Sequence, residues 1–180
     1  MDVPPLHPPA PDPDPAFTPA TLHDRDGRVF TVRAYTPEDR PALDRFYEAF
    51  HPKRAAQGLP PEGAARVARW LDAILPTGTH LVVESEGQLA GHAMLMPTRD
   101  DDVREYAIFL DHGVRGRGVG TQVNRFSAEV ARTMDVRRLW LSVEPHNRPA
   151  VRSYQKAGFR FRGPTLYSPE VEMEMELDLG

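Results

Sequence analysis

Residues 104–134 read REYAIFLDHGVRGRGVGTQVNRFSAEVARTM, and this stretch predicts a strand, a glycine-rich loop and a helix in that order. Arg104–Leu110 has the apolar content and length of a buried strand. Gly113–Gly120 is dominated by glycine and arginine. The helix is predicted by apolar residues that recur at helical spacing directly after the loop: Val119, Val123, Phe126, Val130 and Met134.

The loop has the properties of a pyrophosphate-binding site. Gly116, Gly118 and Gly120 permit backbone conformations, and a close approach to a ligand, that a Cβ atom would prevent. The free N–H groups and the dipole at the start of the following helix favour an anion. Arg115 and Arg117 add positive charge suited to phosphate oxygens. We therefore expect this loop to hold a pyrophosphate.

Other phosphate-binding loops fit the sequence less well. A dinucleotide-binding fingerprint requires a further glycine where Thr121 stands, and a Walker loop requires a lysine that is absent from this region. The pattern that remains is Arg115-x-x-Gly118-x-Gly120. A glycine-rich turn that only caps the helix is the structural alternative.

A second motif follows about thirty residues later. Residues 147–159 read NRPAVRSYQKAGF. Asn147 is a suitable N-cap, Ala150 and Tyr154 share one face of the predicted helix, and Gly158 ends it. Taken alone, this segment is also what a capped amphipathic helix with a core tyrosine would look like.

Together the two motifs resemble those of the GNAT acetyltransferase superfamily, Gln/Arg-x-x-Gly-x-Gly/Ala and Asn-x-x-Ala-x-x-x-Tyr-x-x-x-Gly-Phe. The resemblance covers roughly Arg28–Leu179. It implies an acetyl-CoA-dependent N-acetyltransferase acting on a primary amine, either of a small molecule or of a protein. In that superfamily the strand before the loop and the strand after its helix diverge, which opens a slot for coenzyme A.

The remaining periodicities complete an α/β (α+β) fold in the order βααβββαβαββ, a GNAT-type mixed, mostly antiparallel sheet flanked by helices. Residues 1–22 hold eight of the 19 prolines, which predicts a disordered leader before a single domain over 23–180. The predicted elements are strands at 28–35, 79–85, 88–96, 138–143, 159–162 and 171–179, and helices at 36–50, 67–75 and 147–157.

The resemblance implies roles for the residues of both motifs. Backbone groups near Ile108 and Leu110 would pair with the pantetheine arm, as an added strand would. Asn147 would lie beside that arm or the thioester. The residues that would hold the pyrophosphate, with two arginines near its oxygens, are Arg115, Gly116, Arg117, Gly118, Val119, Gly120 and Thr121.

Acetyl transfer to an amine requires a base for the ammonium proton and an acid for the leaving thiolate. The resemblance assigns the acid role to Tyr154, for which core packing is the alternative. It assigns the base role to Glu105, on the strand before the loop. Glu144 and His146, just after strand 138–143, are the alternative bases, and water can also carry the proton.

Composition narrows the classes of function. The net charge is −4 and the basic residues are dispersed, which argues against nucleic acid as a partner. The chain has no cysteine and no histidine pair at ligand spacing, so we expect no metal. No segment has the length of a membrane span or the pattern of a signal peptide, so we expect a cytoplasmic protein.

Two further questions stay open at this level. The chain could instead be a non-catalytic acetyl-CoA sensor or a nucleotide-binding regulator, although Tyr154 and Glu105 favour turnover. Acidic residues alternate with apolar ones along Val171–Leu179. This pattern is typical of a strand with a solvated face, and the alternatives are attraction of a cationic substrate and pairing with a second subunit in a homodimer.

Overall fold

The computed structural model describes residues 17–56, 58–163 and 172–180. Its strands are β1 Ala20–His23, β2 Val29–Ala34, β3 Thr79–Ser85, β4 Gln88–Pro97, β5 Val103–Leu110, β6 Arg138–Val143, β7 Arg160–Phe161 and β8 Met173–Asp178. Its helices are α1 Arg40–Ala49, α2 Ala64–Ile74, α3 Val119–Thr133 and α4 Arg148–Lys156, with short 3-10 turns η1 Pro37–Asp39 and η2 His112–Val114.

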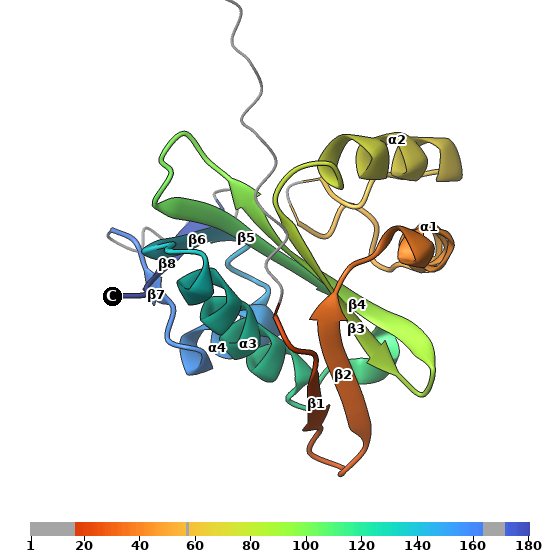
Figure 1. The fold of residues 1–180 in the computed structure, drawn as a ribbon, viewed down its shortest axis with the longest axis horizontal. Coiled ribbons are helices and arrows are strands. Elements are labelled where there is room, and N and C mark those ends of the chain that lie inside the picture. Colours follow the sequence, from red (N-terminus) through yellow and green to blue (C-terminus); the bar gives the residue numbers. More distant parts are fainter. Residues whose placement is uncertain (1–16, 57, 164–171) are drawn as a thin grey trace, which may run out of the picture.

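These strands form one sheet in the order β1-β2-β3-β4-β5-β6-β8-β7. Neighbouring strands are antiparallel except β5 and β6, which run parallel because α3 crosses between them. The mixed, mostly antiparallel sheet with flanking helices confirms the predicted fold class (Figure 1).

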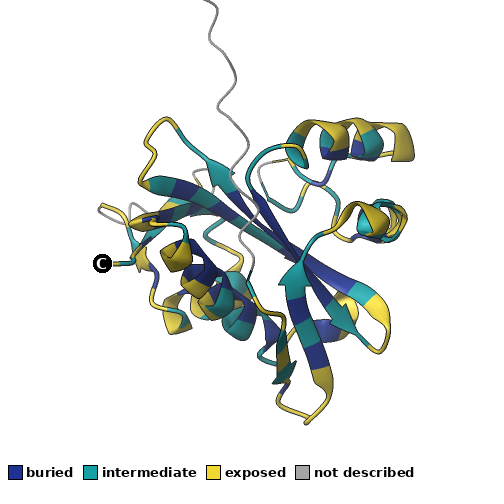
Figure 2. Cartoon of the chain, viewed as in Figure 1, coloured by how far each residue is buried: buried dark blue, intermediate teal, exposed yellow. Residues whose placement is uncertain are grey.

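Helices cover both faces of the sheet and create two cores. In Figure 1, α1 and α2 lie on one side of β4 and β5, and α3 and α4 lie on the other. Alternation along β5 divides its side chains accordingly: Tyr106 is buried toward α3 and α4, and Phe109 is buried toward α1 and α2. Figure 2 shows that buried residues concentrate on the middle strands, while the outer sides of the helices are exposed.

The parallel pair β5–β6 is short. The two strands pair only at Val103↔Arg138, Arg104↔Leu139 and Glu105↔Trp140. Beyond Glu105, β5 stays paired with β4 as far as Leu110, and β6 stays paired with β8 as far as Val143. The sheet is therefore split between β5 and β6 on the side where the glycine-rich loop follows β5.

The structure differs from the sequence prediction at the N-terminus. Residues 20–22 lie in the predicted leader, yet they form most of β1, which pairs antiparallel with β2. The observed order therefore has one more strand than predicted. The prediction of disorder is therefore wrong for these three residues. Residues 1–16 lie outside the described part of the chain.

Smaller differences concern the ends of elements. The first predicted helix begins with the 3-10 turn η1, where Asp39 accepts a hydrogen bond from the backbone N–H of Thr36 at 2.8 Å. The strand predicted at 159–162 is reduced to β7. The last strand begins at Met173, and Val171, where we had expected it to start, lies outside the described residues.

Candidate functional site

The glycine-rich loop follows the C-terminal end of β5, where β5 has separated from β6, and leads into α3. Gly116 and Gly118 have φ angles of 73° and 82°, in the left-handed region that favours glycine. Gly118 is the N-cap of α3, and no side chain caps the helix there. The first N–H groups of α3 therefore have no partner within the helix and are available to an anion.

Arg115 uses its guanidinium to hold the loop in place. Its Nε donates to the carbonyl of Leu110 at 2.8 Å and its Nη2 donates to the carbonyl of His51 at 2.8 Å. The guanidinium also stacks over Phe50, 5.0 Å from the ring centre. Burial lowers the pKa of Arg115. This arginine ties the loop to β5 and to the end of α1.

Arg117 also has a protein partner. Its Nε lies 2.8 Å from Oδ2 of Asp24, and the two side chains are 18% and 1% exposed. Burial opposes ionisation of Asp24, but backbone N–H donors from Arg28 and Asp26 and the charge of Arg117 hold its pKa below the ordinary value. The sequence had given no sign of Asp24, because nothing local connects it to the loop.

A polar network joins the start of α3 to α4 and β5. Tyr106 Oη donates to Asn124 Oδ1 at 2.9 Å, and Asn124 Nδ2 donates to Ser153 Oγ at 3.1 Å. Ser153 Oγ also lies 3.2 Å from Thr121 Oγ1. A Cβ on Gly120 would stand 3.2 Å from Ser153 Oγ, a tight contact, so the close approach of α3 and α4 favours glycine there.

The other predicted coenzyme residues lie around this network. The side chain of Val119 is buried in the core, so this residue could contact a coenzyme only through its backbone. Ile108 and Leu110 are partly buried on the α3 and α4 side of β5, next to the split from β6. Asn147 caps α4, where its side chain accepts from the N–H of Ala150 at 3.3 Å.

Tyr154 lies on α4 and is 8% exposed. Its ring packs against Phe159 and Tyr106, with ring centres 5.6 Å and 6.4 Å away. Burial raises the pKa of Tyr154, so the phenol is protonated at neutral pH. The side chain therefore meets the requirements of a core residue and those of a proton donor.

Glu105 lies on the opposite face of the sheet from Tyr154, at the point where β5 and β6 separate. It is partly exposed, and burial raises the pKa of its carboxyl group. The alternative bases pair with each other: His146 Nε2 lies 3.0 Å from Glu144 Oε2, and the histidine side chain is 75% exposed. Glu105 belongs to the last residue pair before the two strands separate.

A buried chain of hydrogen bonds that the sequence analysis missed joins Tyr47, His92 and His80. Tyr47 Oη lies 2.6 Å from His92 Nδ1, and His92 Nε2 lies 2.9 Å from His80 Nδ1. His80 Nε2 lies 2.8 Å from the carbonyl of Thr77, so this nitrogen carries the proton. His92 Nε2 then donates to His80 Nδ1, and Tyr47 Oη donates to His92 Nδ1. Both imidazoles are neutral in this arrangement. The only sequence signal was the pair of histidines on adjacent predicted strands.

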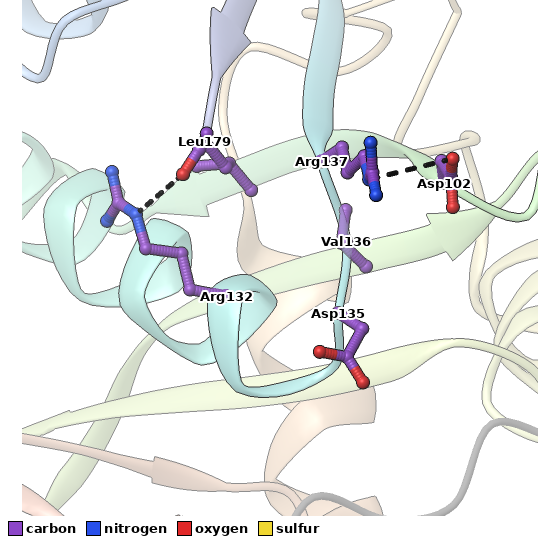
Figure 3. A pocket seen from close by; sticks show the side chains of 7 residues that line it. Asp102, Arg132, Asp135, Val136, Arg137 and Leu179 are labelled. Atoms are coloured by element: carbon purple, nitrogen blue, oxygen red, sulfur yellow. Dashed lines mark hydrogen bonds and ion pairs between the residues drawn. The ribbon is translucent and has the colours of Figure 1, made fainter.

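A shallow cavity of about 460 Å³ lies at the other end of the sheet (Figure 3). Its lining residues are Asp102, Arg132, Asp135, Val136, Arg137, Leu179 and Gly180. The cavity is at the C-terminal end of α3, a helix of 15 residues, which puts it about 22 Å from the loop at the N-terminus. It contains none of the predicted site residues.

Two kinds of feature are absent from the described residues, a membrane-spanning helix and a cluster of metal ligands. No helix there is both long enough and apolar enough to cross a membrane. No group of three or more His, Cys, Asp or Glu side chains is arranged to hold a metal ion within residues 17–56, 58–163 and 172–180.

Residues 40–159 match the model of the acetyltransferase (GNAT) family. The chain belongs to the GNAT family. The match contains the glycine-rich loop, the split between β5 and β6, and the α4 motif, and it confirms the resemblance seen in the sequence.

Among GNAT relatives, the chain is 32% identical over 100 residues to the spermine/spermidine N(1)-acetyltransferase of Bacillus subtilis (strain 168). That match covers 51% of this chain and 66% of the relative, so the chain spans just under two thirds of the relative's length.

Solved GNAT structures share the fold. The GNAT domain of S. lividans PAT superposes with a TM-score of 0.71 at 22% identity, covering 89% of this chain and 96% of that one. The aminoglycoside acetyltransferase AAC(6')-Ib in complex with coenzyme A gives a TM-score of 0.66 at 24% identity, covering 83% and 94%.

Proposed function

We propose that this chain transfers the acetyl group of acetyl-CoA to a primary amine. The observation that carries the proposal is the split between β5 and β6, which opens beside an uncapped helix N-terminus in a glycine-rich loop. A split sheet supplies unpaired strand edges for an extended amide-containing arm, and the uncapped helix supplies N–H donors for phosphates.

The residues present fit a coenzyme with these two parts. Gly116 and Gly118 have no Cβ atom at the phosphate end, and their positive φ angles favour glycine at both positions. Leu110 and Ile108 line the split with partly buried apolar side chains. Arg115 and Arg117 are already engaged by the protein, so their contribution is to hold the loop and to supply positive charge near the phosphates.

Acetyl transfer needs a base that takes a proton from the acceptor amine and an acid that gives a proton to the departing thiolate. The two candidates for these roles lie on opposite faces of the sheet. Glu105, on the α1 and α2 face, would take the proton from the ammonium group of the acceptor, directly or through water. The amine nitrogen then forms a bond to the acetyl carbon while the carbon–sulfur bond breaks, and the nitrogen releases its second proton to water so that a neutral amide results. Tyr154, on the α3 and α4 face, would donate its hydroxyl proton to the departing thiolate.

We further propose a small cationic amine as the acceptor. Glu105 shares its face of the sheet with Trp140, Glu174 and Glu176, as their strand register requires. Arg162 offsets part of this charge, because its Nη1 lies 3.5 Å from Oε2 of Glu174 and its Nε lies 3.9 Å from Oε2 of Glu176. The same register also places Arg138 and Arg160 on this face. The name of the B. subtilis relative makes spermidine and spermine the first acceptors to test.

The test has two stages. Isothermal titration with acetyl-CoA should give saturable binding with a micromolar dissociation constant. Release of free thiol should then be followed with spermidine, spermine, an aminoglycoside and a short peptide with a free N-terminus. Turnover only with the peptide would redirect the proposal to a protein acceptor. Binding without turnover on a broad amine panel would favour a sensor, and no binding at millimolar acetyl-CoA would refute the proposed function.

A further inference from the structure

The turn between β1 and β2 has a fixed shape. The N–H of Asp24 donates to the carbonyl of Arg28 at 2.9 Å. Oδ1 of Asp24 accepts from the N–H groups of Asp26 and Arg28, both at 2.9 Å. A short side chain that satisfies backbone donors two and four residues ahead holds the turn closed. The position of Arg25, inside this turn, is therefore determined by its neighbours.

The same turn is attached to the glycine-rich loop. The N–H of Arg25 donates to the carbonyl of Arg117 at 3.0 Å, and the Asp24 carboxylate pairs with the Arg117 guanidinium. One helical turn further on, Gln122 Nε2 donates to the carbonyl of His23 at 2.8 Å. These contacts join residues almost a hundred positions apart in the sequence. They hold the β1–β2 turn against the glycine-rich loop and the first turn of α3.

The side chain of Arg25 extends over Gly118. A Cβ built on Gly118 would lie 3.5 Å from Cγ and 3.5 Å from Nε of Arg25. The residue is exposed. Within the described part of the chain, no hydrogen bond or ion pair occupies its guanidinium, whereas those of Arg115 and Arg117 are occupied. A cation with no partner thus stands at the positive end of α3, an arrangement that repels cations and attracts anions.

We propose that Arg25 binds a phosphate group of the coenzyme, so that the β1–β2 turn forms part of the coenzyme site. The inference rests on the proposed function and deepens it. A guanidinium binds phosphate oxygens through paired N–H donors, whether they belong to the pyrophosphate or to the 3′-phosphate of coenzyme A. Asp24 acts as a positioning residue, because it fixes both the turn and Arg117.

The experiment compares coenzyme affinity in Arg25→Ala, Arg28→Ala and the unmodified protein at one ionic strength. Arg28 is an exposed arginine at the end of the same turn, so its replacement removes the same charge from nearly the same place. Titrations use acetyl-CoA and its 3′-dephospho analogue. The midpoint of urea unfolding in each variant verifies that the fold is retained.

We expect Arg25→Ala to weaken binding of acetyl-CoA about tenfold and Arg28→Ala to weaken it less than about twofold. A loss seen with both ligands would assign Arg25 to the pyrophosphate, and a loss seen only with acetyl-CoA would assign it to the 3′-phosphate. Equal affinity in Arg25→Ala and the unmodified protein, or an equal loss in Arg28→Ala, would overturn the inference and leave the proposed function standing. No binding by the unmodified protein would overturn both.

Discussion

At the scale of single residues, Tyr154 combines a packing role with a protonated hydroxyl, and the two can be separated. Phenylalanine keeps the ring contacts with Phe159 and Tyr106 and removes only the hydroxyl. We expect Tyr154→Phe to lower kcat about a hundredfold, the lower range for loss of a general acid. The dissociation constant for acetyl-CoA should change less than about twofold in titration.

Tyr106→Phe is the matched control for this prediction. It also removes one hydroxyl from a buried ring, and it breaks the hydrogen bond to Asn124. The free energy of unfolding should fall by about 1 kcal/mol, with kcat much less affected than in Tyr154→Phe. If the two variants lost kcat to the same extent, Tyr154 would be a core residue only.

Glu105 allows a test through pH. A base must be deprotonated to act, and burial raises the pKa of this carboxyl group above its ordinary value. Activity should therefore increase as pH rises through that raised pKa, and Glu105→Gln should lose this increase along with at least about a hundredfold in kcat/KM. The measurement is kcat/KM against pH with one acceptor amine. The acceptor's own titration is common to both proteins and cancels in their ratio.

Glu144→Gln provides the comparison for Glu105→Gln, because Glu144 directly follows β6 and is an alternative base. Its pH profile should match that of the unmodified protein. A flattened profile in Glu144→Gln and an unchanged one in Glu105→Gln would transfer the base role to the Glu144–His146 pair.

At the scale of elements, the N-terminus of α3 depends on the backbone conformation of its N-cap. Gly118→Ala would introduce a Cβ at φ 82°, which costs about 1 kcal/mol of stability, and would place it in van der Waals contact with Arg25, 3.5 Å from Cγ and Nε. We expect the affinity for acetyl-CoA to fall at least about tenfold, because the N–H groups that we propose for phosphate binding would shift. Isothermal titration and urea unfolding measure the two effects separately.

Gly63→Ala separates strain from site damage. Gly63 is the N-cap of α2 with φ 89°, and a Cβ there would meet no atom within 4 Å. The variant should lose at least as much stability, because φ 89° with ψ 138° lies outside the left-handed helical region that Gly118 occupies, and it should keep its affinity for acetyl-CoA. If both variants lost affinity equally, the loop around Gly118 would not be the phosphate site.

Local signals explain which elements could be predicted from the sequence. The helices α3 and α4 each have their own apolar periodicity and cap residues, and the loop has its own glycines. The predicted positions of these elements were therefore nearly correct. Strand β1 has four residues with alternating burial and follows a proline-rich segment. It forms because β2 offers a free edge, and a strand specified by its partner leaves little trace in its own sequence.

The site shows the same limit. The sequence predicted site roles for Gly118 and Tyr154 because their motifs are contiguous. It could not show that Arg117 pairs with Asp24 or that Arg115 donates to the carbonyl of His51, because these partners are brought together only by the tertiary fold. Two arginines expected to face phosphates therefore serve partly to hold the loop.

At the scale of the whole molecule, the buried chain Tyr47–His92–His80 links α1 to the central strands β3 and β4 and to the end of α2. Burial lowers the pKa of His92, and the proximity of His80 lowers it further. Burial also lowers the pKa of His80, although carbonyl acceptors from Thr77 and Ile74 oppose this. Both side chains are therefore neutral in the folded protein at neutral pH.

The consequence for stability has a definite sign. A histidine in the unfolded chain titrates near 6.5, so below that pH the unfolded state binds protons that the folded state does not. The free energy of unfolding should be constant above about pH 7 and should fall as pH decreases from 6.5, by at most about 1.4 kcal/mol per pH unit for each buried histidine. Urea unfolding between pH 5 and 8 measures this slope.

His92→Gln tests the origin of that slope. Glutamine retains some hydrogen bonding to Tyr47 and His80 but cannot titrate, so stability at pH 7.5 should fall by about 1–3 kcal/mol while the slope below pH 6.5 becomes shallower. His146→Gln is the control, because that histidine is 75% exposed, and it should keep the slope of the unmodified protein. An unchanged slope in His92→Gln would mean that other groups govern acid sensitivity. A shallower slope would show that the helical layer of α1 and α2 is joined to the sheet by a connection that acid weakens.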